Sequence, residues 1–211
     1  GDGDTGLNTG GMGTIAPNPY YTPAIAQRCM EEIFLPTIAA MNAEGRTFTG
    51  CLYFGLMMTP KGPKVIEYNC RFGDPETQVV LPLLKSDLLT IMRATVDGTL
   101  ADTPVEFASG AACCVVLASG GYPVSYKSGY PISGLDEAGK TATVFHAGTK
   151  LVDGQIVTAG GRVLGVTATA DTLEAAIDKA YQAADKITFT DMHMRRDIGQ
   201  RALASRKESH S

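Results

Sequence analysis

The stretch VIEYNCRFGDPE, residues 65–76, begins as an apolar strand and gathers charge within a few positions. In an extended strand, alternate side chains share a face. The pattern therefore predicts that Glu67, Asn69 and Arg71 point one way, whereas Ile66 and the residues at the same spacing after it point the other way.

The spacing of Glu67 and Asn69 suits a small hard cation. A rise of about 3.3 Å per residue places their Cα atoms about 6 to 7 Å apart, so oxygens of both side chains can reach one ion. Mg²⁺ or Mn²⁺ favours oxygen ligands, and Mg²⁺ usually keeps waters and completes its shell with substrate phosphates. Arg71 could stabilise a transferring phosphoryl group or bind a carboxylate. The alternative is a surface ion pair.

Asp74 and Glu76 follow the turn after this strand. An Asp-Pro pair is typical of a helix start, so the first role expected of Asp74 is to cap a helix, and both carboxylates suit the positive end of a helix. A contact with substrate is the alternative for each residue.

The sequence opens on a glycine-rich loop, GDGDTGLNTGGMG, residues 1–13. Glycines let a backbone approach an anion closely and turn its N–H groups toward it, and Asn8 and Thr9 add side-chain hydrogen bonds. We therefore predict that the loop, including Gly10 and Gly11, faces a substrate; the alternative is a mobile surface linker. Because there is no initiator methionine, we also expect a fragment whose preceding part is missing.

The hydrophobic pattern predicts an α+β chain in two parts. Thr22-Pro23 supplies the start of a helix that Pro36 should bend or split. The runs 51–58 and 64–69 are typical of a hairpin, the first strand being buried on both faces, and 86–97 predicts an amphipathic helix.

The segment 100–110 has the polar and small composition of a connection, so we place a boundary between residues 106 and 107. Beyond it, AACCVVLAS, FHAGT and GGRVLGVTATA are strand-like, and TLEAAIDKAYQAADKI has apolar residues at helical spacing. The second part is therefore expected to be a compact α+β unit.

Composition disfavours several classes of partner. The 211 residues are 44% apolar and 19% charged, with a formal net charge of -4, so no broad basic surface is available for nucleic acid. The sequence has no run of about 18 apolar residues to cross a bilayer. Five cysteines without a CxxC pair suit a reducing cytoplasm. His146 has no histidine near it in sequence and is interpreted as structural rather than as a metal ligand or base.

Longer sequence motifs favour the ligand-binding interpretations of these residues over the structural ones. IEYNC followed by RFGDPETQ resembles the signature of the phosphoribosylamine-glycine ligase family, also called glycinamide ribonucleotide synthetases, in the ATP-grasp superfamily. GDGDTGLNTGGMG, TGCLYFGLM, LKSDL, GGYP, VFHAGT, GGRVLGVTA and RRDIG resemble further family blocks in the family's order. The resemblance covers Gly1 to about Ala204.

The resemblance implies a fold and an activity. Residues 1–106 would form the later part of an ATP-grasp domain, an antiparallel sheet with helices, and residues 107–211 a small α+β C-terminal domain. Family members join glycine to 5-phosphoribosylamine in purine synthesis, through an acyl phosphate, while ATP is split to ADP and phosphate. Such phosphoryl transfer needs positioning and charge neutralisation more than a protein nucleophile.

By the same resemblance, Glu67 and Asn69 match divalent-metal ligands, for Mg²⁺ or Mn²⁺, and Arg71 matches a catalytic arginine beside the reacting phosphates. Asp74, Glu76 and the opening loop match signature positions for which substrate binding is implied. The family's adenine contacts and phosphate-binding lysines precede this segment. The isolated chain is therefore expected to be inactive, with the missing N-terminal part of the same polypeptide as its partner.

Two other interpretations stay open. One is a different ATP-grasp carboxylate-amine ligase, because the metal-binding ExN pair recurs across that superfamily; the RFGDPE string argues against it. The other is a nucleotide-binding module without turnover. The presence of three polar groups on one strand face argues against such a module, because desolvating them costs free energy unless a ligand or ion satisfies them.

Overall fold

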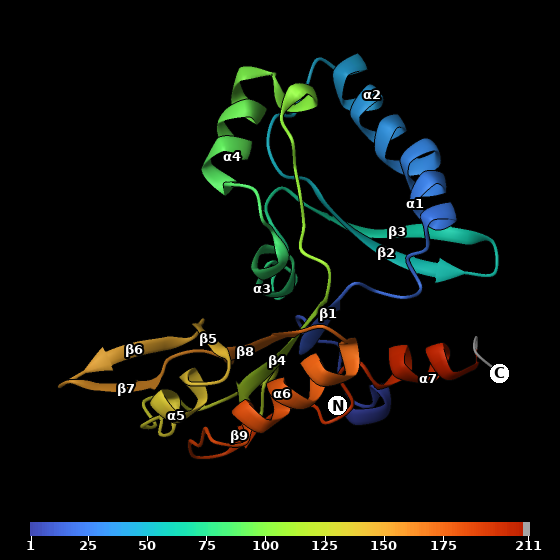
Figure 1. Cartoon of the computed structure of the whole chain (residues 1–211). Helices are drawn as coiled ribbons and strands as arrows, with labels where there is room; N and C mark the ends of the chain where they lie inside the picture. Colours follow the sequence, from blue (N-terminus) through green and yellow to red (C-terminus); the bar gives the residue numbers. More distant parts are fainter. Residues whose placement is uncertain (209–211) are drawn as a thin grey trace. The chain divides into compact units, whose positions relative to one another are not determined.

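The computed structural model describes residues 1–208, with side chains described as far as residue 205, and the chain divides into two compact units (Figure 1). The first, here called the sheet unit, comprises residues 1–18, 74–83 and those from Ala108 onward. The second, the helix-hairpin unit, comprises Pro19–Gly73 and Leu84–Phe107. The predicted domains, 1–106 and 107–211, stay a prediction; in the compact units, two earlier segments pack with the C-terminal residues.

The sheet unit is built around β4 (Ala111–Ser119), all nine of whose residues are buried. A strand without polar alternation is typical of one that is covered on both faces. The antiparallel sheet has the order β1-β4-β8-β5, with β9 also paired to β4 (Figure 1). Its other strands are β1 (Gly13–Ala16), β8 (Arg162–Ala170), β5 (Thr143–His146) and β9 (Met192–His193).

Helices pack on both faces of β4. α6 (Leu173–Ala184) lies along one face of β4 and β8, and its first turn is capped by Thr172, whose hydroxyl accepts a hydrogen bond from the Ala175 N–H (Figure 1). α3 (Thr77–Val80) lies on the other face, where Val79 packs with Cys114. This layered arrangement confirms the predicted α+β class.

The remaining elements of the sheet unit are short. They are η1 (Asp2–Asp4), η3 (Leu81–Leu83), α5 (Leu135–Gly139), the hairpin of β6 (Thr149–Val152) and β7 (Gln155–Thr158), and α7 (Gln200–Glu208). Neither β1 nor α5 was predicted, because runs of four and five residues are too short to display a period.

The helix-hairpin unit begins with α1 (Pro23–Cys29), which continues through the π-helical segment η2 (Met30–Phe34) into α2 (Leu35–Ala43). Thr22 caps α1 as predicted, its hydroxyl accepting a hydrogen bond from the Ile25 N–H at 3.3 Å. We expected Pro36 to bend or split this helix. The structure splits it there: the wider turn of η2 ends at Phe34, and α2 begins at Leu35 with Pro36 in its first turn, where the proline's missing N–H is tolerated.

The predicted hairpin is present as β2 (Tyr53–Thr59) and β3 (Gly62–Asn69), which pair antiparallel. Burial of β2 on both faces was a wrong prediction: Met57 and Met58 are 54% and 43% exposed, because this sheet has only two strands. Ile66 lies at the register shift between Gly55 and Leu56 and is 62% exposed, and Tyr68 of the same strand is 51% exposed.

The second half of the helix-hairpin unit is α4 (Leu88–Asp97), followed by η4 (Leu100–Asp102). The carboxylate of Asp87 caps α4, accepting a hydrogen bond from the Thr90 N–H at 2.7 Å, and Gly98 ends it with a left-handed φ of 72°. The predicted amphipathic helix is therefore confirmed. Within the part of the chain that the structure describes, no helix is long and apolar enough to span a membrane.

The cysteines of β4 give a first test of this packing. Burial raises the pKa of the Cys113 thiol to about 12 and that of Cys114 to about 11, whereas Cys70 is exposed. Because the thiolate is the nucleophile, we expect iodoacetamide at pH 8 to label Cys70 and to leave the two β4 thiols unlabelled until the protein is unfolded. Peptide mass spectrometry measures this; labelling of Cys113 as fast as Cys70 would contradict the packing.

Candidate metal and substrate site

Glu67 and Asn69 lie together at the end of β3, as the strand period predicts. The Asn69 Nδ2 donates a hydrogen bond to the Glu67 Oε1 at 3.1 Å, and the carboxylate is exposed. Opposite them on β2, a Cβ atom at Gly55 would lie 2.8 Å from the Glu67 Cγ. The absence of a side chain at Gly55 therefore leaves room for Glu67 to lie across the neighbouring strand.

The other face of β3 is apolar. Tyr68 and Cys70 line a cavity of about 610 Å³ together with Ile33 and Met41 of the helices. Neither Glu67 nor Asn69 lines this cavity, and Tyr68 and Cys70 are themselves exposed.

Arg71 lies just beyond β3 and is exposed. Its Nη1 donates to the carbonyl of its neighbour Phe72 at 2.8 Å. Among the described residues, no hydrogen bond or ion pair joins Arg71 to Glu67 or Asn69. The predicted three-residue face is therefore a close pair, with the arginine free to turn toward a ligand.

Glu67 and Asn69 fit part of a divalent-metal shell. They offer one carboxylate oxygen and, after rotation of the amide, one amide oxygen, which is the hard donor set that Mg²⁺ and Mn²⁺ prefer. The described residues contain no group of three or more His, Cys, Asp or Glu side chains placed to hold a metal. Among the described residues, this pair alone would therefore fill only part of the coordination shell of such an ion.

A second cluster of predicted site residues lies in the sheet unit, centred on Arg162 at the start of β8. The Arg162 Nη1 donates to the carbonyls of Gly11 at 3.2 Å and Asp74 at 2.9 Å, and Nη2 forms an ion pair with the Asp74 Oδ2 at 3.0 Å. The Gly10 N–H donates to the hydroxyl of Tyr122 at 3.1 Å. We call these five residues the Arg162 cluster.

Close packing requires a glycine at position 11 and leaves little room for a side chain at position 10. A Cβ at Gly11 would lie 2.4 Å from the Pro75 Cδ, and one at Gly10 would lie 3.1 Å from the Arg162 Cζ. The backbone of the glycine-rich loop therefore approaches other parts of the protein closely, in addition to any approach to a ligand. Within the loop, Asn8 is exposed and the Thr9 hydroxyl donates to the Gly10 carbonyl at 2.6 Å.

The prediction that Asp74 caps a helix was wrong. The N-cap of α3 is Glu76, without a side-chain capping bond. The Asp74 carboxylate instead accepts hydrogen bonds from the Gln78 Nε2 at 2.9 Å and from Arg162. A guanidinium is a stronger partner for a carboxylate than a backbone N–H, and sequence around Asp74 alone does not reveal it.

Two polar side chains near Asp74 have acceptor capacity to spare. The Gln78 Oε1 is buried and has no hydrogen-bond partner among the described residues. Glu76 is half-buried one residue before α3. Unpaired buried acceptors are costly, so a ligand that donates hydrogen bonds would be stabilised here.

Arg162 and Tyr122 were not assigned a role from the sequence. Both lie in strings that match family blocks, GGRVLGVTA and GGYP, and that match was the available signal. Their contacts with residues 10–11 and 74 span at least 88 positions of sequence, so no local pattern could reveal them.

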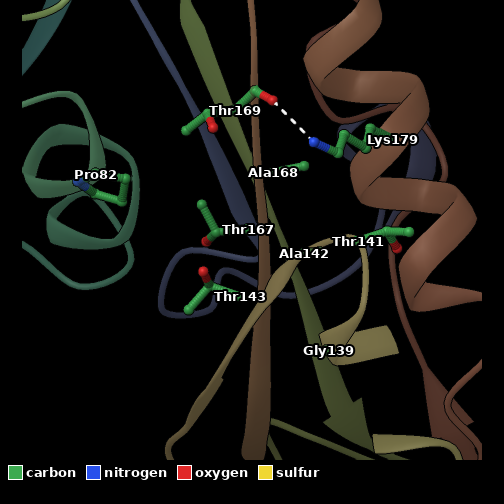
Figure 2. Close-up of a pocket in the computed structure, with 9 residues that line it drawn as sticks. All are labelled: Pro82, Gly139, Thr141, Ala142, Thr143, Thr167, Ala168, Thr169 and Lys179. Atoms are coloured by element: carbon green, nitrogen blue, oxygen red, sulfur yellow. Dashed lines mark hydrogen bonds between the residues drawn. The ribbon is translucent and has the colours of Figure 1, made fainter. Parts of the chain in front are cut away.

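A separate cavity of about 420 Å³ lies at the edge of β8 in the sheet unit (Figure 2). β5 pairs with β8 only as far as Thr167, and the cavity forms where the pairing stops. Lys179 of α6 reaches toward it and donates to the Thr169 carbonyl at 3.4 Å (Figure 2). Its lining contains none of the residues predicted to act, so it is not the candidate site.

Comparisons with known proteins give two family matches along the chain. Residues 1–77 match the family model of the phosphoribosylglycinamide synthetase ATP-grasp (A) domain, and residues 112–201 match that of its C domain. The biotin carboxylase domain of Hydrogenobacter thermophilus 2-oxoglutarate carboxylase shares the fold, with 16% identity and a TM-score of 0.56 over 87% of this chain and 40% of that one. The chain therefore carries part of an ATP-grasp domain and the C domain that follows it.

Nearer relatives identify the family. The phosphoribosylamine-glycine ligase of Agrobacterium fabrum is 52% identical over 207 residues, which is 98% of this chain and 49% of the relative. The crystal structure of the Thermotoga maritima protein of that name is 40% identical, with a TM-score of 0.82, over 93% of this chain and 48% of that one. The chain belongs to the phosphoribosylglycinamide synthetase family, and it spans about half the length of the relatives it matches.

Proposed function

We propose that the polypeptide to which this chain belongs ligates glycine to 5-phosphoribosylamine, with ATP split to ADP and phosphate, as a step of purine synthesis. The observation that carries the proposal is the 52% identity to a phosphoribosylamine-glycine ligase across 98% of this chain. The strings that hold the predicted site residues lie within the matched region.

The chemistry explains why ATP is consumed. The carboxylate of glycine is a poor electrophile, because attack on it must build a second negative charge. Transfer of the γ-phosphoryl group to a carboxylate oxygen gives glycyl phosphate and ADP. The ribosylamine nitrogen then attacks the carbonyl carbon, the C–O bond to phosphate breaks, and the nitrogen loses a proton. Each step needs alignment and charge neutralisation.

Glu67 and Asn69 would hold a divalent cation, Mg²⁺ or Mn²⁺, whose remaining ligands are water and the phosphates of ATP. Bound there, the ion supplies charge neutralisation for phosphoryl transfer. Arg71 is exposed next to this pair and has guanidinium donors beyond its bond to Phe72, so it can turn to the transferring phosphoryl group or the glycine carboxylate.

The Arg162 cluster would position the amine-bearing substrates. Asn8, Thr9, Gly10 and Gly11 supply hydrogen-bonding groups on the loop. On the other side of the cluster, the Asp74 and Glu76 carboxylates and the Gln78 Oε1 are acceptors that suit the ammonium of glycine or the amine of the ribosylamine. Arg162 places Asp74 against the loop and thereby joins the two sets of groups.

The test is a substrate comparison with a polypeptide of the relatives' full length. We expect it to form ADP only when glycine and 5-phosphoribosylamine are both present, and we expect the 211-residue chain alone to form none, because it matches only half of its relatives. Turnover with another amino acid and not with glycine would reassign the protein to another ATP-grasp ligase. Nucleotide binding without turnover would indicate a binding module.

A further inference from the structure

Asp2, Gly3 and Asp4 of the glycine-rich loop are held by a second cluster, separate from the Arg162 cluster. The Gly3 N–H donates to the Asp197 Oδ2 at 2.8 Å, and the Arg196 N–H donates to the Asp2 Oδ1 at 2.7 Å. Asp4 forms ion pairs with Arg195, at 3.0 Å, and with Arg201. All of these partners come from the RRDIG string and the helix after it.

Asp197 is the centre of this second cluster. Arg195 binds its carboxylate with two donors, Nε to Oδ1 at 2.7 Å and Nη2 to Oδ2 at 2.7 Å, and the Gly3 N–H adds a third bond. Two-donor pairing of this kind fixes both direction and distance. The hydrogen bonds from Arg195 hold the pKa of the Asp197 carboxyl well below its usual range, so it stays ionised at neutral pH.

The turn that carries Asp197 is fixed to the core of the sheet unit. The hydroxyl of Tyr181, on α6, donates to the Arg195 carbonyl at 2.8 Å and accepts from the Ile198 N–H at 3.0 Å. Burial raises the pKa of Tyr181 to about 12, so this hydroxyl keeps the proton it donates. A continuous chain of hydrogen bonds therefore runs from Tyr181 of α6 through Arg195 and Asp197 to Gly3.

Between its two anchored ends, the glycine-rich loop is exposed to solvent. Gly10 and Gly11 are held by Tyr122 and Arg162, and Gly3 and Asp4 by Asp197 and its neighbours. The residues between them are mostly exposed, with Leu7 at 64%. A short segment that is fixed at both ends samples few conformations, although it makes few contacts itself.

We propose that Asp197 is a positioning residue: with Arg195, it fixes the Gly3–Asp4 end of the loop so that Asn8 and Thr9 are held where substrate binds. The assignment of those two residues rests on the proposed function. Asp197 itself touches no substrate in this scheme. Its loss would lower the fraction of loops in the binding-competent arrangement, and apparent affinity falls by that same fraction.

The experiment uses the full-length polypeptide with Asp197→Asn, and Asp178→Asn as a matched control, since Asp178 is an exposed carboxylate on α6. For Asp197→Asn we expect KM for glycine or for the ribosylamine to rise about tenfold, with kcat changed much less. We also expect thermolysin to cleave at the Gly6-Leu7 bond about tenfold faster, because the loop is released. Asp178→Asn should change neither quantity.

Asp4→Asn removes the carboxylate that pairs with Arg195 and Arg201 and should shift both readouts in the same direction by less, which keeps the test available if Asp197→Asn does not fold. Unchanged KM and unchanged cleavage in Asp197→Asn, or equal changes in Asp178→Asn, would overturn the proposal. The cleavage readout does not depend on activity. If the polypeptide ligated no glycine, the proposed function would be refuted. The cleavage rate would still test whether Asp197 anchors the Gly3–Asp4 end of the loop.

Discussion

Replacing Glu67 by Gln in the full-length polypeptide is expected to lower turnover by at least about 100-fold at limiting Mg²⁺. The amide keeps the shape of the side chain and an oxygen that can accept the bond from the Asn69 Nδ2, so the hairpin should fold unchanged. What is lost is the negative charge that holds the cation and the phosphates bound to it. Initial rates across a Mg²⁺ titration measure the effect.

Glu44→Gln serves as the control for Glu67→Gln. Glu44 is an exposed carboxylate of the same helix-hairpin unit, at the end of α2 and away from β3 in sequence, so its replacement should leave rate and Mg²⁺ dependence unchanged. The metal role of Glu67 would be refuted by a Glu67→Gln enzyme with normal rates at limiting Mg²⁺.

Replacing Gly11 by Ala should lower kcat/KM by about 100-fold, which is the size of effect that a displacement of about 1 Å produces at a site of reaction. The added methyl group would lie 2.4 Å from the Pro75 Cδ. Both atoms belong to stiff groups, so the loop or the Asp74-Pro75 segment must move. Either movement disturbs the bonds of Arg162 to Gly11 and Asp74.

Gly139→Ala is the matched substitution for Gly11→Ala. Gly139 ends α5 in the same sheet unit, and no atom lies within 4 Å of the place where its Cβ would be. Its kcat/KM should stay within about twofold of the parent's, because surface changes of this kind have small effects. If the kcat/KM of Gly11→Ala equalled that of Gly139→Ala, the close approach of Gly11 to Pro75 would not matter for activity.

Residue propensities and hydrophobic periodicity correctly predicted the elements in which the pattern is clear. The alternation in residues 65–71 placed Glu67 beside Asn69, the unbroken apolar run at 111–119 gave the buried central strand, and Thr22 gave the start of α1. Each of these depends on residues that are near one another in sequence, which is the range over which propensity and period act.

Features set by distant partners could not be predicted in this way. Asp74 has the sequence context of a helix cap, yet its carboxylate is bound by Arg162, 88 residues further on. The exposure of Ile66 and Tyr68 depends on β3 pairing with β2 alone in a two-stranded sheet, which the sequence of β3 does not encode. Tertiary contacts overrode the local preference in both cases.

The pairing of β1 with β4, together with the packing of α3 on the same strand, bears on how this protein can be divided. A polypeptide that started at residue 107 would still contain most of the sheet and α6. It would lack the edge strand and the helix that shield Ala112 and Cys114, and a row of unpaired backbone groups would face water. Such a piece would tend to self-associate. The solubility of the C-terminal half therefore depends on β1 and α3, which lie much earlier in the sequence.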